Sequence, residues 1–124
     1  MTMTAMGLFD GFSEAQRLIR PLLAQGVWSE DITIIANREE TSRGDVLAAA
    51  AWGVNVDVGP ASRGQPAALI AFGVPADKTR RYASAIDDGG ALVSVVVAED
   101  QVEQALALIE QHRAADLAAP EMRS

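Results

Sequence analysis

Few side chains in this 124-residue chain have the type and spacing that catalysis or metal binding requires. His112 is the only histidine, so the chain cannot form a histidine pair around a metal ion. It falls near the end of an expected helix, where the helix dipole stabilises a cation. The chain has no cysteine, which excludes thiolate metal sites, disulfides and cysteine nucleophiles. We therefore interpret His112 as a surface residue and not as a catalytic base.

Three pairs of adjacent carboxylates could serve as metal ligands or as an acid–base couple. They are Glu39–Glu40, Asp87–Asp88 and Glu99–Asp100. Their spacing does not match an oxygen-rich calcium loop, and adjacent carboxylates in loops and helix caps are usually solvated. We therefore predict no catalytic residue, no metal site and no cofactor, and we interpret the chain as a non-enzyme.

Arg80 and Arg81, followed by Tyr82, could hold a small anion through guanidinium forks and ring stacking. Asp77 precedes them by three and four residues, so pairing along the helix is the simpler interpretation. Gly89–Gly90 lies between a helix and a strand, the reverse of the order in a phosphate-binding loop. It predicts a left-handed helix stop and a tight turn. A small-molecule-sensing regulatory domain that uses Arg80 and Arg81 is the alternative function.

Composition and charge exclude several classes of partner. Hydrophobic residues make up 49% and charged residues 22% of the chain, as is usual for a soluble domain. The net charge of −7 opposes binding to nucleic acid. The start, MTMTAMG, lacks the features of a signal peptide, and the longest apolar stretch, Val46–Val58, is too short to span a membrane. We predict a cytoplasmic protein without a membrane span.

Two strand–helix–strand units, residues 5–36 and 75–118, are joined by a central segment, residues 37–74. Two such halves predict one α+β domain: a ferredoxin-like split β-α-β sandwich with a four-stranded antiparallel sheet, helices on one face and a helical central insertion. The expected strands are Met6–Phe9, Ile32–Ala36, Ala91–Val97 and Ala115–Ala118. In the central segment we expect helices at Val46–Gly53 and Gln65–Phe72 and a short extended stretch between them, although the pattern leaves the conformation of 44–73 open.

The expected helix ends follow from local signals. Ser13 and Gln16 have the spacing of a capping box at the start of the first helix. Pro21 lacks a backbone donor and should bend that helix near Arg17. Gly26 is the expected stop, and Asp100 is the expected cap of the last helix.

Both faces of the expected sheet are apolar. On Ala91–Val97, three valines form one face, and Leu92 and Val96 lie on the other; Ile35 adds to that second face from the neighbouring strand. The second face should therefore be covered, either by the central segment or by the sheet of a second copy. We take Leu92, Val96, Ile35 and Trp52 as candidate interface residues and expect a homo-oligomer, with a dimer favoured and a protein partner possible.

Trp28, which follows the first helix, is expected to be a lid on the core. A third interpretation, a small enzyme of the dimeric ferredoxin-like kind, would need an apolar cavity that Trp28 or Trp52 lines.

The segment AFGVPADKTRRYASAIDDGGALVSVVV, residues 71–97, resembles the bacterial general stress proteins of the YflT-like, heat-induced type. The matching pattern is Gly73-Val74-Pro75, then Arg81-Tyr82, then Gly89-Gly90 before a valine-rich strand. GLFD at Gly7–Asp10, SEAQ at Ser13–Gln16 and Asp31-Ile32 extend it. Many such proteins carry a long glycine-rich insertion, which is compact here. The resemblance implies a non-enzymatic stress-associated protein and supplies no catalytic residues.

Overall fold

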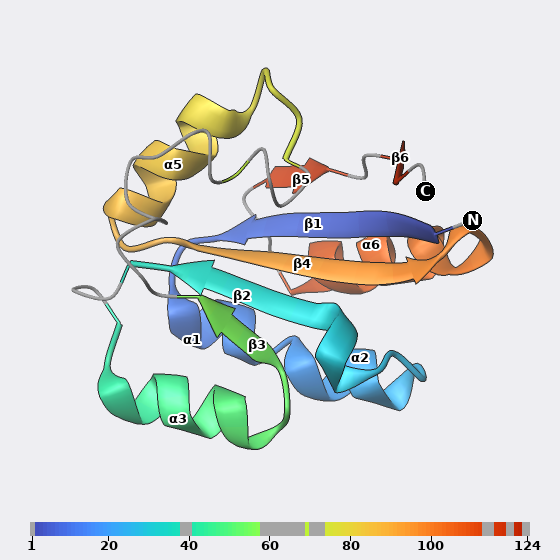
Figure 1. The fold of residues 1–124 in the computed structure, drawn as a ribbon, viewed down its shortest axis with the longest axis horizontal. Coiled ribbons are helices and arrows are strands. Elements are labelled where there is room, and N and C mark those ends of the chain that lie inside the picture. Colours follow the sequence, from blue (N-terminus) through green and yellow to red (C-terminus); the bar gives the residue numbers. More distant parts are fainter. Residues whose placement is uncertain are drawn as a thin grey trace.

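The computed structural model describes residues 2–37, 41–57, 69, 74–112, 116–118 and 121–122. In this part of the chain, strands and helices build an α+β fold around one sheet (Figure 1). The strands are β1 (Thr2–Phe9), β2 (Ile32–Ala36), β3 (Asn55–Asp57), β4 (Ala91–Ala98), β5 (Asp116–Ala118) and β6 (Glu121–Met122). The helices are α1 (Phe12–Gln16), α2 (Ile19–Ala24), α3 (Arg43–Ala51), α5 (Thr79–Asp87) and α6 (Val102–Gln111). Two turns of 3₁₀ helix, Ser29–Asp31 and Glu99–Gln101, precede β2 and α6.

The sheet is mixed, so the prediction of a wholly antiparallel sheet is wrong. The strand order is β3–β2–β4–β1–β5, with β6 pairing to the start of β1. β1 and β4 pair antiparallel over their whole length, from Thr2 opposite Ala98 to Phe9 opposite Ala91. β3 runs parallel to β2. The parallel pair arises because α3 lies between these two strands in the chain, and such a crossover returns the next strand in the same direction.

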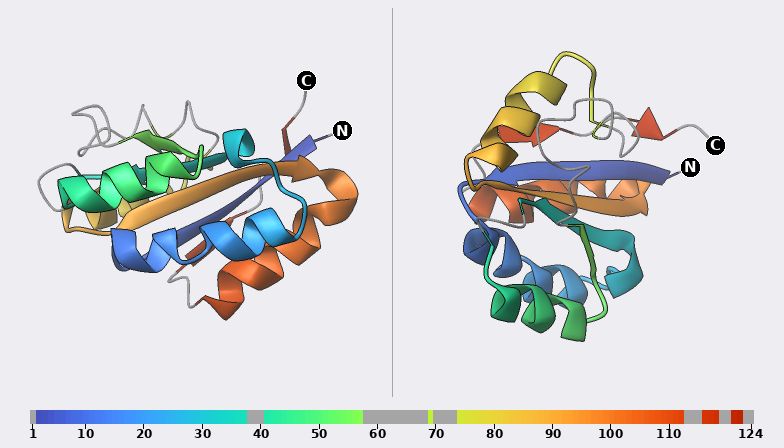
Figure 2. Two further views of the ribbon diagram at one scale, coloured as in Figure 1. Left: turned by 90° about the horizontal axis from the view of Figure 1, so that it is seen from below. Right: turned by 60° about the vertical axis from the view of Figure 1, so that its left-hand side comes forward.

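One face of the sheet is covered by α1, α2 and α6, which lie on the same side (Figure 2). Their apolar stripes pack on alternate residues of the strands, such as Ile34 on β2 and Val95 on β4. The helical spacing of the apolar residues in the sequence matches the buried faces of these helices. The buried apolar residues include Ala15, Ile19 and Leu22 in the first two helices, Leu18 between them, and Val102, Ala105 and Ile109 in α6.

The other face is covered by α5, so the prediction of helices on one face alone is wrong (Figure 2). Tyr82 and Ile86 of α5 are fully buried and share a second apolar cluster with Leu92 and Ile35. The buried side of this amphipathic helix consists of Thr79, Tyr82, Ala83 and Ile86. The apolar second face is therefore explained within the chain, because α5 folds back over it.

The helix starts differ from the sequence signals. Gly11 is the N-cap of α1 and makes no side-chain capping bond, so the predicted capping box of Ser13 and Gln16 is absent. Gln101, not Asp100, precedes α6, because a 3₁₀ turn occupies the expected cap. The bend near Arg17 is confirmed: α1 ends at Gln16 and α2 begins at Ile19. Pro21 has no N–H to donate to the Arg17 carbonyl, which weakens the helix there.

The end of α5 is a Schellman motif. The Gly89 N–H donates to the Ile86 carbonyl at 3.1 Å, and the Gly90 N–H donates to the Ala85 carbonyl at 2.8 Å. Gly89 has φ of 104°, as the predicted left-handed stop requires, and Gly26 has φ of 94° at the end of α2. The glycine pair therefore sets the turn from α5 into β4.

The central segment contains the predicted helix, now Arg43–Ala51, and the predicted extended stretch, now β3. The helix expected at Gln65–Phe72 falls outside the described residues except for Leu69, which is helical and buried. Trp28 is 72% exposed, so the prediction that it covers the core is wrong. It is the N-cap of the 3₁₀ turn at Ser29–Asp31, two residues after Gly26, which has a positive φ.

Thr4 provides a first testable prediction. Its Oγ1 is buried and has no hydrogen-bond partner in the described structure. The Thr4→Val variant keeps the side-chain shape and removes the cost of an unpaired polar atom, so we expect the free energy of unfolding to rise by about 1 kcal/mol in urea titrations. Thr79 is the matched control, because its buried Oγ1 donates to the Ala76 carbonyl at 2.9 Å. Thr79→Val should lower stability by about 1 kcal/mol. Equal destabilisation by both variants would contradict this assignment.

Candidate functional site

The four candidate interface residues end up in different environments. Leu92 and Ile35 are fully buried beneath α5, so they cannot contact a partner in this fold, and their assignment as interface residues is corrected. Val96 lies on the same face of β4 and is half-buried. Trp52, the C-cap of α3, is 44% exposed. Of these four candidates, only Trp52 therefore presents a large apolar area to the outside.

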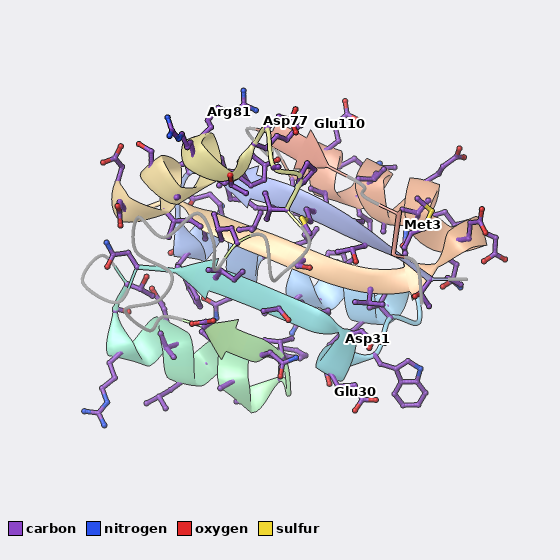
Figure 3. The ribbon with its side chains drawn as sticks, turned by 45° about the horizontal axis from the view of Figure 1, so that its top comes forward. Met3, Glu30, Asp31, Asp77, Arg81 and Glu110 are labelled. Atoms are coloured by element: carbon purple, nitrogen blue, oxygen red, sulfur yellow. The ribbon has the colours of Figure 1, made fainter. Side chains whose placement is uncertain are left out.

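Arg80 and Arg81, the predicted anion contacts, lie on the exposed side of α5. Figure 3 shows Arg81 and Asp77 projecting outward from the same side of the molecule, away from the sheet. Neither arginine lines any of the hollows described below. None of the hollows that we describe brings another candidate residue to this pair.

The outer face of α3 is apolar and exposed. Of its nine residues only Ala49 is buried, while Leu47 is 62% exposed. Gly44, Leu47, Ala48 and Ala51 are all exposed, and their spacing places them on one side of the helix. We call these four residues the α3 surface. Ser42 begins the helix, since its Oγ accepts a hydrogen bond from the Asp45 N–H at 3.1 Å.

A groove of about 400 Å³ lies between the first two helices and the end of α3. Figure 1 shows these helices on the same side of the molecule. The lining residues are Ser13, Gln16, Arg17, Ile19, Arg20 and Trp52, and we call this hollow the arginine groove. The Cζ atom of Arg20 lies 5.5 Å from the centre of the Trp52 ring, in cation–π contact. The groove thus combines two guanidinium groups with an indole wall.

Sequence reasoning missed this groove. It assigned Ser13 and Gln16 to a capping box and did not single out Arg17 or Arg20 as ligand contacts. One signal was present: residues 13, 16, 17 and 20 have the spacing of one helix face. The contribution of Trp52 could not be read from spacing, because its position beside Arg20 depends on how α3 packs against α1 and α2.

A neighbouring hollow of about 440 Å³ contains the only histidine. It is lined by Asp10, Glu14, Arg17, Gln111 and His112. The Nδ1 atom of His112 lies 2.9 Å from the Leu108 carbonyl, one turn earlier in α6. As the donor in that bond, Nδ1 carries the proton, and the ring sits at the C-terminal end of the helix as expected from the sequence.

The two acidic pairs within the described residues do not line this hollow. Asp87–Asp88 and Glu99–Asp100 are exposed, and Glu39–Glu40 lies outside the described residues. Within the described ranges, no three histidine or acidic side chains gather closely enough to hold a metal ion. In the same ranges, none of the helices has the length and apolarity needed to cross a bilayer.

Comparisons with protein-family models, curated proteins and solved structures find no match for this chain. The α3 surface and the arginine groove are therefore the features of this chain from which a function can be inferred.

Proposed function

We propose that this chain is a non-enzymatic, stress-associated cytoplasmic protein that acts by self-association, and that a second copy docks on the α3 surface. The single observation that carries the proposal is the exposure of an apolar helix. α3 has one buried residue in nine, although most of its side chains are apolar. A helix of this composition is normally covered, and an uncovered apolar face is typical of an interaction site.

Charge favours a second copy at this face. Two copies that each carry a net charge of −7 repel one another over most of their surfaces. The α3 surface contains no charged side chain, so it can approach its own copy without like-charge contacts. Its small residues, Gly44, Ala48 and Ala51, allow two helices to pack closely around Leu47.

A two-fold axis would also improve the electrostatics of α3. We propose an axis perpendicular to α3, which sets the two helices antiparallel while the same surface serves both copies. Arg43 stands at the first position of α3, where the helix dipole disfavours a cation. In the antiparallel pair, Arg43 of each copy faces the C-terminal end of the other helix, where a cation is favoured. A nine-residue helix is only about 13 Å long, so we expect a weak, concentration-dependent dimer.

We also propose a ferredoxin-like core and membership of the YflT-like general stress proteins. The order β5–β1–β4–β2 supports the core, because these neighbours are antiparallel. α1 and α2 connect β1 to β2, and α6 connects β4 to β5 on the same face. β3 and α5 are then additions to that core. The family proposal rests on the sequence motifs alone.

The Leu47→Glu variant tests self-association. We expect wild-type mass in multi-angle light scattering to rise with concentration toward twice 13.1 kDa. Two glutamates at the centre of a two-fold contact should weaken the dimer at least tenfold, because each copy loses an apolar contact and gains a repelling charge.

Trp28→Glu is the matched control, since it places the same charge on another exposed apolar residue. It should leave the association constant unchanged. A wild-type protein that stays monomeric at every concentration contradicts the proposal, and so does equal weakening by both variants. Purification as a stable complex with a different protein would show that this protein, and not a second copy, is the partner.

A further inference from the structure

We propose that the arginine groove binds a small organic anion that combines a planar ring with a phosphate, of the nucleoside monophosphate class. The groove does not include the α3 surface, but Trp52, which lines the groove, directly follows Ala51 of that surface. It also differs from the sequence-based alternative, which placed an anion at Arg80 and Arg81.

The charge of the groove is the first argument. Arg17 and Arg20 are the only charged side chains among its six lining residues, so its local charge is +2 in a chain of net charge −7. In the described part of the structure, neither guanidinium forms an ion pair. Arg17 also lines the neighbouring hollow beside Asp10 and Glu14, but no carboxylate lines the groove itself. Guanidinium groups hold phosphate oxygens through paired N–H donors.

Two uncharged polar side chains, Ser13 and Gln16, also line the groove. The α1 cap does not use Ser13 or Gln16. Both side chains line the groove, and neither has a hydrogen-bond partner among the described contacts. Their donors are therefore available to a ligand. Together with Arg17 they lie along one helix face that ends at the bend before α2. A phosphate at this position could accept hydrogen bonds from Ser13, Gln16 and Arg17.

The third argument is the indole wall. Trp52 is 44% exposed, and Arg20 already lies over its ring at 5.5 Å. The indole is an aromatic wall beside which a ligand ring can lie, the Arg20 guanidinium offers a planar cation for stacking, and Ile19 provides an aliphatic side. A volume of about 400 Å³ is in the range of small-molecule sites. The groove therefore favours a ligand with both a planar ring and a charge over a bare inorganic anion.

The test uses tryptophan fluorescence and calorimetry with adenosine monophosphate as the probe. The Trp28→Phe variant leaves Trp52 as the only tryptophan, so any change in emission reports on the groove. We expect adenosine monophosphate to quench Trp52 with a Kd of about 1 mM or tighter. Arg17→Gln should weaken binding at least tenfold, because it removes a charge-assisted hydrogen bond. Arg80→Gln, on the exposed side of α5, should have no effect.

Each comparison can overturn a part of the proposal. Equal affinities for adenosine and adenosine monophosphate would show that the phosphate does not contribute to binding. Equal affinities for inorganic phosphate and adenosine monophosphate would show that the ring does not contribute. No binding by either method, or binding that Arg17→Gln leaves unchanged while circular dichroism shows a folded protein, would overturn the site. The ligands and variants are compared at one protein concentration, and self-association is measured separately by light scattering, so failure here is distinguishable from failure of self-association.

Discussion

The Gly90→Ala variant should lose about 3 kcal/mol of the free energy of unfolding, a large share of the stability of a domain this size. A Cβ at this position would lie 2.8 Å from the Ala85 carbonyl oxygen and 2.9 Å from the Phe9 carbonyl oxygen. Both obstacles are backbone, so no side-chain rotation can relieve them. The end of α5 and the end of β1 would have to separate.

Urea titration and thermal unfolding measure this effect. We expect a decrease of roughly 10 °C in the melting temperature. Gly26→Ala is the control, because Gly26 has φ of 94° and nothing lies within 4 Å of the added Cβ. It should cost only the strain of a left-handed alanine, about 1 kcal/mol. If Gly90→Ala costs no more stability than Gly26→Ala, the close approach of Gly90 to the Ala85 and Phe9 carbonyl oxygens is not present in solution.

Local patterns predict much of this fold. The period-two alternation in residues 91–97 indicated a strand, and the apolar spacing of Leu18, Ile19 and Leu22 indicated the buried side of the first helices. Gly26 and Gly89 were identified as helix stops because few other residues adopt a positive φ. These features depend only on residues that are close together in the chain, so they can be predicted from the sequence alone.

Features set by tertiary packing were harder to predict. The amphipathic pattern of α5 showed that one side is buried but not which face of the sheet it covers. The same pattern of apolar residues at Leu92 and Ile35 fits an interface or an internal core equally well. The exposure of Trp28 and Trp52 likewise follows from the directions in which neighbouring elements leave the sheet, and hydrophobicity alone does not specify those directions.

The candidate site illustrates the same limit. Arg17 and Arg20 are unremarkable in the sequence, where they look like solvated charges on an amphipathic helix. They become a site only because α3 brings Trp52 beside them. Conversely, Arg80 and Arg81 attracted attention as adjacent cations, yet the described structure places no other candidate residue around them.

The Leu92→Ala variant separates the two explanations of the apolar second face. Leu92 is fully buried against α5 and shares a cluster with Tyr82 and Ile86. Truncation should leave a cavity and cost about 3 kcal/mol of the free energy of unfolding. Because α5 belongs to the same chain, that loss should be the same at every protein concentration.

Val96→Ala is the matched comparison on the same face of the same strand. Val96 is half-buried, so its truncation should cost about 1 kcal/mol. If the second face were instead an interface between copies, Leu92→Ala would weaken association and its cost would depend on concentration, since subunit binding contributes to stability by mass action. Equal, concentration-dependent losses in both variants would show that α5 does not cover this face, and a concentration-independent difference between them would place Leu92 in the core of a single chain.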